Sequence, residues 1–376
     1  MKRLLTAVLL AAACACAQAA GFDALGKPDH VWQGARIWRD LKYGPRPDAP
    51  GEGEAYKSPI THRDVHGHVV HSHRTGQFYD LLVPEGGAKA DAPVYLNVHG
   101  GAWSAPCDKD GENIWFFVHL VQRGFVVVSI DYILQPDVLG GAPVSAIRPD
   151  ATFLDMLRDI DAAVTYLKTD LLPKLGVRTD RLAVGGGSAG AHLSLLYGLD
   201  QDNPSVLSAG LRHDLRVGFI VDYVGPTDFT NEDFLKPLST NRMPLGSIFN
   251  RDAIAKFGVL LDGLVGRDLR ALRAEGRGEE ALAELRRFSP LHLLTPHSVP
   301  ILMAHSQLWP LSSTDGCVPV SMYRDMVARL DVLAVHHEAQ LRCWAAHGWM
   351  KSDQEQWLVE RCARFANRYL KTGTTK

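Results

Sequence analysis

The sequence predicts an α/β protein built on a doubly wound, mostly parallel sheet. Short apolar runs alternate with stretches of helical spacing along most of the chain. The runs at 93–103 and 124–132 are rich in Val and Ile without alternation, which is typical of parallel strands buried on both faces. Strands that alternate with helices over this length indicate helices on both sides of one sheet.

The first 19 residues predict a secretory signal peptide. Two basic residues precede an apolar run that ends at Ala17-Gln18-Ala19, a small-x-small cleavage pattern. The run is shorter than the roughly 20 apolar residues that a membrane span needs. We therefore expect a secreted or periplasmic protein without a transmembrane segment. A lipid anchor through Cys14 or Cys16 is the less favoured alternative, because no leucine stands three residues before either cysteine.

The composition is that of an ordinary globular protein, and the length beyond the predicted signal suffices for one large core or two modest domains. We expect a single domain over residues 20–376. The formal net charge of −2 and the lack of a basic patch argue against nucleic acid as a partner. Four cysteines lie beyond the predicted signal, and an oxidising compartment favours one or two disulfides among them. Their pairing is left open by the sequence, since four cysteines allow three full pairings; they are Cys107, Cys317, Cys343 and Cys362.

Residues 20–75 predict an irregular N-terminal arm, because Pro, Gly and charged residues dominate its first part. The histidine-rich stretch 65–73 predicts an edge strand or hairpin within that arm. In a strand, His66 and His68 share one face while His71 and His73 share the other, so the four do not converge on a metal ion. We expect no metal site.

The remaining elements follow in order. Helices are expected over 113–123, after Pro149, over 191–199 and over 353–370, and strands over 180–184, 217–229 and 299–306. Residues from about 230 to 288 break this rhythm, because they are rich in Arg and Glu and carry leucines at helical intervals. This stretch predicts a cap-like helical insertion, which is either a lid over a site or a set of plain solvated helices.

The stretch AVGGGSAGAH, residues 183–192, fits two kinds of turn. Gly185, Gly187 and Gly190 match the dinucleotide fingerprint G-x-G-x-x-G, whereas Gly186, Ser188 and Gly190 match the nucleophile turn G-x-S-x-G. A dinucleotide turn belongs to the first βαβ unit and needs an acid about 20 residues on, and neither condition holds here. We therefore expect no cofactor, and Ser188 is the predicted nucleophile.

A serine nucleophile needs backbone N–H donors for the oxyanion formed at the carbonyl. The loop HGGAW, residues 99–103, ends a predicted strand and has side chains small enough for close approach to a substrate. The predicted donors are the N–H groups of Gly101, Ala102 and Ala189. Trp103 is expected to shape the substrate pocket, with an ordinary core position as the alternative.

The nucleophile also needs a base and an acid, which in this chain order follow the serine. His347 is the one histidine after Ser188 that lies between a candidate last strand and the terminal helix. Asp315 follows the strand at 301–304 and precedes Val318-Pro319, where a helix is expected to start. His192 is expected to pack structurally on the helix after the turn. The loop 305–313 is longer than this arrangement requires.

Together these motifs resemble the α/β-hydrolase superfamily, specifically secreted carboxylesterases of the hormone-sensitive-lipase-like and bacterial feruloyl-esterase-like branch. HGGAW, SIDY, DRLAVGGGSAGAHLS, VDYVGPTDF, SPLHLL, TDGCVP and AAHGW occur in the family's order. The resemblance implies hydrolysis of small-molecule or polysaccharide-linked esters by Ser188, Asp315 and His347 through an acyl-enzyme. HGGAW also resembles the H-G-G-x-W loop of kynurenine formamidases, so an amidase or formamidase is one alternative and a non-catalytic scaffold is another.

Overall fold

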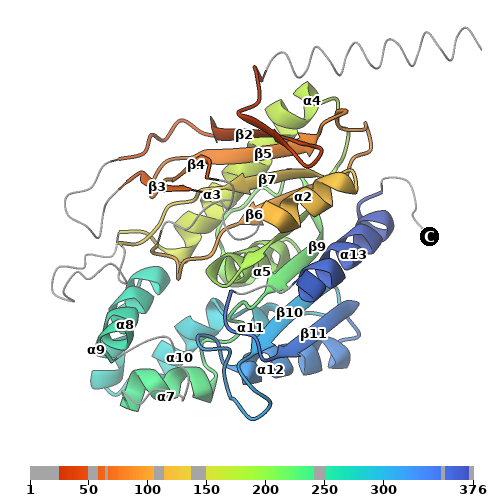
Figure 1. The fold of residues 1–376 in the computed structure, drawn as a ribbon. Coiled ribbons are helices and arrows are strands. Elements are labelled where there is room, and N and C mark those ends of the chain that lie inside the picture. The colour runs from red at the N-terminus through yellow and green to blue at the C-terminus, as the bar shows by residue number, and fades with distance from the viewer. Residues whose placement is uncertain are drawn as a thin grey trace, which may run out of the picture.

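A nine-stranded sheet forms the centre of the protein, in the order β1-β2-β5-β7-β6-β8-β9-β10-β11 (Figure 1). The computed structural model describes residues 25–49, 58–63, 67–105, 114–136, 150–240, 251–348 and 352–371. Six neighbouring strands are mutually parallel; they are β7 (Val126–Ile130), β6 (Val94–Val98), β8 (Arg181–Gly187), β9 (Arg216–Tyr223), β10 (Ile301–Gln307) and β11 (His337–Cys343). The predicted fold class, an α/β-hydrolase sheet, is confirmed.

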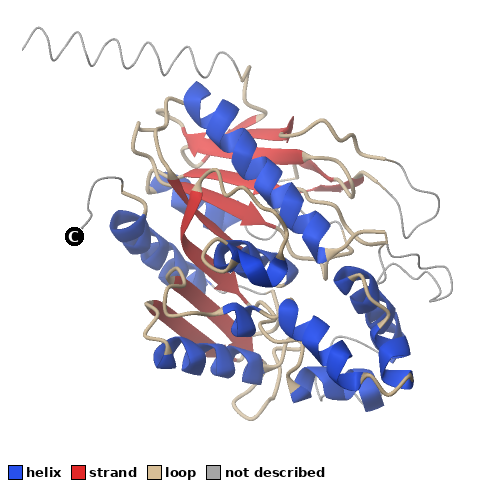
Figure 2. Cartoon of the chain, turned by 180° about the vertical axis from the view of Figure 1, so that it is seen from behind, coloured by secondary structure: helices blue, strands red, loops and turns tan. Residues whose placement is uncertain are grey.

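Helices cover both faces of this sheet, as a doubly wound fold requires. Helices α2 (Ile114–Gln122) and α13 (Ser352–Tyr369) pack on one face, which is turned to the viewer in Figure 1. The other face carries α3 (Phe153–Tyr166), α5 (Ala189–Asp200) and α12 (Val320–Val332), and Figure 2 shows helices crossing it. The central strands are therefore buried on both sides, which explains their unbroken Val and Ile runs.

Helix α3 shows how local sequence sets an element's start. Its N-cap Thr152 accepts a hydrogen bond from the Asp155 backbone N–H, and the Asp155 carboxylate accepts one from the Thr152 backbone N–H. This reciprocal capping box satisfies two donors that a helix start otherwise leaves unpaired. The helix passes into a π-helical segment, Leu167–Leu171, and a short α4, Leu172–Lys174.

The described parts of the stretch from 230 to 288 are mainly helical, as predicted from its leucine spacing. It contains four helices in the described residues: α7 (Glu232–Thr240), α8 (Arg251–Val265), α9 (Leu269–Ala274) and α10 (Gly278–Arg287). Figure 1 shows them gathered beyond one end of the sheet. Two single-turn helices, α6 (Pro204–Leu207) and α11 (Pro290–Leu293), complete the described set.

The prediction of an irregular arm over residues 20–75 is wrong for much of its length. Strand β2 (Ala35–Lys42) pairs antiparallel with both β1 (His30–Trp32) and β5 (Phe78–Pro84), and β5 in turn pairs antiparallel with β7. These strands form because β5 offers an open edge for pairing, which is a tertiary effect that local propensity does not contain. The stretch 65–73, predicted as an edge strand or hairpin, supplies one strand, β4 (Val69–Ser72), which pairs with β3 (Ile60–Arg63) that precedes it.

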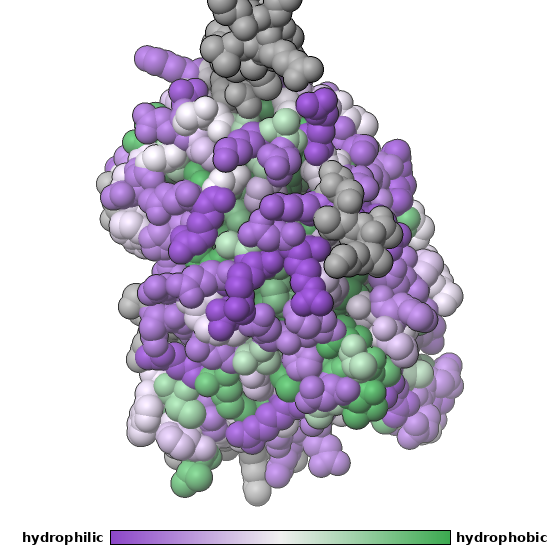
Figure 3. All heavy atoms as spheres, turned by 90° about the vertical axis from the view of Figure 1, so that its right-hand side faces the viewer, coloured by the Kyte–Doolittle hydropathy of each residue, from purple (hydrophilic) through white to green (hydrophobic). Residues whose placement is uncertain are grey.

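The outer surface is mainly hydrophilic on the face drawn in Figure 3, with smaller apolar patches between the polar side chains. Within the described ranges, no helix combines the length and apolar character of a bilayer-spanning segment. The predicted signal peptide, residues 1–19, lies outside the described residues. Cys107 also lies outside them, and the three described cysteines, Cys317, Cys343 and Cys362, are free thiols.

Candidate active site

Ser188 stands at a strained turn between β8 and α5. Its backbone has φ 54° and ψ −120°, a conformation that non-glycine residues rarely adopt and that costs about 1–3 kcal/mol. The Ser188 N–H donates to the Tyr223 carbonyl at 2.8 Å, which ties the turn to the neighbouring strand β9. The turn places Ser188 at the N-terminus of α5, whose dipole favours negative charge nearby.

Two glycines allow this turn to approach the loop that follows β6. A Cβ on Gly186 would lie 2.0 Å from the Val98 carbonyl oxygen, and one on Gly190 would lie 1.9 Å from the same atom. Both contacts are with backbone, which cannot move aside as a flexible side chain can. The glycines of G-x-S-x-G are thus required by close packing, which rules out any larger residue at either position.

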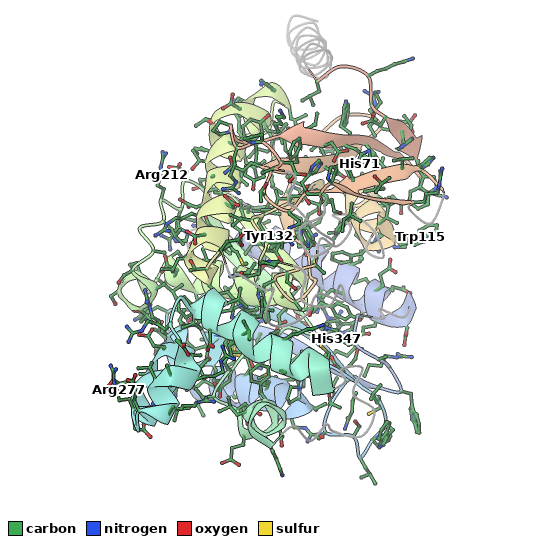
Figure 4. The ribbon with its side chains drawn as sticks, turned by 90° about the vertical axis from the view of Figure 1, so that its left-hand side faces the viewer. His71, Trp115, Tyr132, Arg212, Arg277 and His347 are labelled. Carbon is green, nitrogen blue, oxygen red and sulfur yellow. The ribbon has the colours of Figure 1, made fainter. Side chains whose placement is uncertain are left out.

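The structure brings Ser188, His347 and Asp315 together in one hydrogen-bonded chain. His347 Nε2 lies 2.8 Å from Ser188 Oγ, and His347 Nδ1 lies 2.8 Å from Asp315 Oδ2. A backbone hydrogen bond from the His347 N–H to the Asp315 carbonyl, also 2.8 Å, fixes the two loops to each other. In Figure 4, His347 lies well inside the outline of the molecule, whereas Arg212 and Arg277 lie at its edge.

The Asp315 carboxyl is fully buried and is held as an anion. Its Oδ1 accepts hydrogen bonds from the backbone N–H groups of Cys317 at 2.9 Å and Val318 at 2.7 Å. Burial by itself raises the pKa of Asp315, but the charge of His347 and these hydrogen bonds outweigh it, so the net shift is downward. A charged Asp315 favours the Nδ1–H tautomer of His347, which leaves Nε2 free to accept a proton.

The electrostatics of His347 favour its protonated form. Burial of the imidazole opposes protonation, but the interactions with Cys317 and Asp315 prevail and raise the pKa of His347 well above 6.5. The contribution of Cys317 is a feature that the sequence analysis did not assign. The sequence feature that points to Cys317 is its position two residues after Asp315, in the loop that contacts the His347 imidazole.

A second histidine approaches Asp315 from the side of strand β10. His305 Nε2 lies 4.0 Å from Asp315 Oδ2, beyond hydrogen-bonding distance, and its ring stacks on Tyr323. Burial lowers the pKa of His305 to about 4, so its ring is neutral at physiological pH. The proximity of His305 to Asp315 is not predictable from the sequence, because His305 is on a strand and its distance to Asp315 depends on the path of the loop between them.

The predicted oxyanion loop has an unusual backbone. Gly101, Ala102 and Trp103 have φ values of 101°, 50° and 59°, three consecutive residues in the left-handed region. Within the part of the chain that the structure describes, the N–H groups of Gly101 and Ala102 donate to no acceptor. The Ala189 N–H opens α5 and has no acceptor within the helix. A Cβ on Gly100 would lie 3.5 Å from Ser188 Cβ, so this loop lies against the serine.

The Trp103 side chain is buried, with 3% of its surface exposed, so the alternative of a core position is the one observed. Its ring lies edge-on to Phe153 and Phe229, and Phe257 of helix α8 is also in contact. Direct contact with substrate, as first predicted, is therefore not its evident role. We interpret Trp103 as the residue that joins the oxyanion loop to the helical insertion.

His192 has the structural role expected of it. Its Nε2 lies 2.8 Å from the Phe288 carbonyl oxygen, and burial lowers the pKa of His192 to about 3. It therefore stays neutral and donates to that carbonyl, which ties α5 to the end of the helical insertion. Among the described residues, no group of histidines, cysteines and carboxylates is placed to hold a metal ion.

The sheet order, the strained serine turn and the hydrogen-bonded triple define the class of the protein as an α/β-hydrolase. Within that class, residues 79–256 match the model of the BD-FAE family, so this stretch of the chain is similar to that family.

The comparisons with individual proteins agree with this class. The probable carboxylic ester hydrolase LipM of Mycobacterium tuberculosis is 27% identical over 216 residues, which is 56% of this chain and 46% of LipM. The chain therefore spans less than half the length of that relative. Esterase B from Lactobacillus rhamnosis, solved in an inhibited form, superimposes with a TM-score of 0.58 at 15% identity and covers 97% of this chain and 95% of its own. An esterase from the bacterial hormone-sensitive lipase family gives 0.51 at 19% identity, over 78% of this chain and 82% of its own.

Proposed function

We propose that this protein hydrolyses carboxylic esters, with Ser188 as nucleophile, His347 as general base and Asp315 as the acid that orients His347. The observation that carries the proposal is the hydrogen-bonded chain from Asp315 through His347 to Ser188, which stands at a turn of strained backbone. Relatives named as ester hydrolases and solved neighbours named as esterases support it.

The reaction follows from this arrangement. His347 Nε2 accepts the proton of Ser188 Oγ as that oxygen forms a bond to the ester carbonyl carbon, and the carbonyl π electrons move onto oxygen. The N–H groups of Gly101, Ala102 and Ala189 stabilise this oxyanion. Collapse of the intermediate breaks the bond to the alcohol oxygen, which takes the proton from His347. Water, deprotonated by His347, then attacks the acyl-enzyme and releases the carboxylic acid and free Ser188.

The substrate we propose is an ester of a small molecule or one linked to a polysaccharide. Because the proposed N-terminal signal directs the chain out of the cytoplasm, we place the protein in the periplasm or outside the cell. Intact mass of the mature protein tests the location: cleavage after Ala19 supports it, whereas a retained N-terminus contradicts it. A mass increase at Cys14 or Cys16 would indicate the lipid-anchored form instead.

Hydrolysis of a substrate panel tests the activity directly. The panel holds p-nitrophenyl esters of increasing acyl length, methyl ferulate, acetylated xylan and N-formylkynurenine. We expect turnover of at least one ester and a loss of about 10⁶-fold in kcat for Ser188→Ala, the scale seen when a serine nucleophile is removed. Turnover of N-formylkynurenine alone would replace the esterase with a formamidase. An inactive wild type would leave the non-catalytic scaffold.

A further inference from the structure

The strained oxyanion loop needs contacts that hold it in place. Ala102 and Trp103 are non-glycine residues at positive φ, and each such residue costs on the order of 1–3 kcal/mol unless its surroundings impose that conformation. Inside the loop, the N–H groups of Ser104 and Ala105 donate to the Gly101 carbonyl, at 3.0 and 2.8 Å. These internal bonds close the turn but do not fix it to the rest of the fold.

Two external donors hold the loop from outside. The Trp103 carbonyl accepts a hydrogen bond from the Gln135 N–H at 2.9 Å, and the Ser104 carbonyl accepts one from Arg74 Nη1 at 3.2 Å. The second guanidinium nitrogen of Arg74, Nη2, donates to the Leu134 carbonyl at 3.3 Å. The Leu134 N–H in turn donates to the Arg74 carbonyl at 2.8 Å. One side chain therefore joins the loop after β6 to the loop after β7.

Arg74 is well suited to this task. Its side chain is buried, with 3% of its surface exposed, and a guanidinium carries several donors in a rigid plane that reaches two carbonyls at once. A buried cation is costly without partners. The guanidinium of Arg74 has the two carbonyl acceptors and also interacts with the Asp150 carboxyl, where its charge opposes the rise in the Asp150 pKa caused by burial. The residue lies after β4, outside the stretch that matches the BD-FAE family.

The backbone around Arg74 is itself fixed by a second set of contacts, which we call the Asp48 anchor and define as Asp48, Ser58 and residues 73–76. Asp48 Oδ1 accepts from the N–H groups of Thr75 and Gly76, at 3.1 and 3.3 Å, and Oδ2 lies 3.1 Å from His73 Nδ1. Ser58 Oγ donates to Asp48 and accepts from the Arg74 N–H at 3.0 Å. The guanidinium is thus held at its base as well as at its tip.

We propose that Arg74 is a positioning residue for the oxyanion hole. It touches no reacting atom; it holds the Ser104 carbonyl so that Ala102 and Trp103 keep their left-handed backbone and the N–H groups of Gly101 and Ala102 face the oxyanion. This inference rests on the proposed esterase function for its kinetic consequence. Its structural consequence, an ordered loop at 101–105, is independent of any substrate.

The test compares Arg74→Lys with Arg39→Lys, two substitutions that both keep the charge and lose the planar fork. Arg39 is also buried, but its guanidinium pairs with Asp80 at 3.2 Å in the N-terminal part of the sheet, away from the loop. We expect kcat for a p-nitrophenyl ester to fall about 10- to 100-fold in Arg74→Lys, with KM within about twofold, because the loss falls on donors used in the transition state. Arg39→Lys should keep kcat near wild type.

Two further readouts separate positioning from general stability. Millimolar guanidinium should restore part of the lost kcat in Arg74→Ala by occupying the vacated space. Hydrogen exchange at residues 100–105 should rise in Arg74→Lys and stay at the wild-type level in Arg39→Lys. Hydrogen exchange needs no ester turnover, so it can contradict the proposal for Arg74 while the esterase proposal stands. Equally, the Arg74 proposal can hold if no ester is hydrolysed. Unchanged exchange in Arg74→Lys, or equal kcat losses in the two lysine variants, would overturn the proposal.

Discussion

Two parts of the molecule hold the candidate site in different ways. At the turn between β8 and α5, the backbone alone sets the geometry, because Gly186 and Gly190 leave no room for a single added carbon. At the N-terminal end, the Asp48 anchor and Arg74 set it through side-chain hydrogen bonds between residues distant in sequence. The first device is encoded in a short motif and tolerates no change. The second depends on several hydrogen bonds between distant residues, so we expect the loss of any one of them to reduce activity or stability only in part.

Among changes that leave the nucleophile in place, the largest effect is expected where the loops that carry Asp315 and His347 meet. Asp315→Asn removes the anion that orients His347, and the amide offers an N–H where His347 Nδ1–H needs an acceptor. We expect kcat to fall about 10⁴-fold, the size of the loss when this acid is neutralised in a serine-histidine-aspartate triad. Steady-state ester hydrolysis measures it. A loss below tenfold would show that Asp315 does not orient the base.

The close backbone packing at the turn between β8 and α5 is tested by a pair of glycine substitutions. In Gly190→Ala, the new Cβ would lie 1.9 and 2.5 Å from the carbonyl oxygens of Val98 and His99, so we expect destabilisation of about 3 kcal/mol or more. Gly187→Ala is the matched control, because the Cβ added there would lie 3.6 Å from its nearest atom, Tyr223 Cδ1, which is an ordinary contact distance. Urea denaturation measures both. Equal midpoints would show that close packing does not explain the glycine at 190.

The same division explains which features the sequence predicts. Ser188, His347 and Asp315 follow from short motifs and chain order, because parallel strands bring the loops at their carboxyl ends to one edge of the sheet. The sequence does not predict strands β1 and β2, since their pairing depends on the open edge that β5 offers. The role of Arg74 was also invisible, because its partners Ser104 and Leu134 lie 30 and 60 residues away in the chain.

The helical insertion falls between these cases. Leucine spacing predicts its helices, since one apolar stripe per helix is a local property. The burial of Trp103 against Phe257 of that insertion is a long-range packing result, and the motif HGGAW contains no sign of it. A pattern therefore predicts that a residue is near the site more readily than it predicts which way its side chain points.

The contribution of the Asp48 anchor to stability is tested by Asp48→Asn. Hydrogen bonds to the carboxylate, chiefly from His73 and Ser58, outweigh burial and lower the pKa of Asp48 below its ordinary value of 3.8. Because the folded pKa is the lower one, the stabilisation is fully present above about pH 4 and is lost as the pH falls through the folded pKa.

We expect Asp48→Asn to lose about 1–2 kcal/mol of unfolding free energy at pH 7. The difference from wild type should shrink as the pH drops below 4, and denaturation at several pH values measures it. Asp170→Asn is the control, since Asp170 is half exposed and its ion pair with Lys174 spans 4.0 Å. Equal losses in the two variants would argue against the Asp48 anchor.

The smallest effect concerns Cys317, whose interaction raises the pKa of His347. Catalysis needs neutral His347, so kcat/KM should rise with pH through an apparent pKa above 6.5. In Cys317→Ala, this rise of kcat/KM should occur at lower pH. Cys343→Ala should leave it in place, because the Cys343 thiol bonds to Gln307 instead. An unchanged apparent pKa in Cys317→Ala would show that Cys317 does not raise the pKa of His347.

The central claim is that the hydroxyl of Ser188 is the reacting atom of the site. Treatment with a fluorophosphonate probe, followed by peptide mass spectrometry, tests it most directly because the probe bonds covalently to an activated serine. We expect one adduct, on the peptide that carries Ser188, and none after Ser188→Ala. Equal labelling of wild type and variant, or an adduct on another serine, would contradict it.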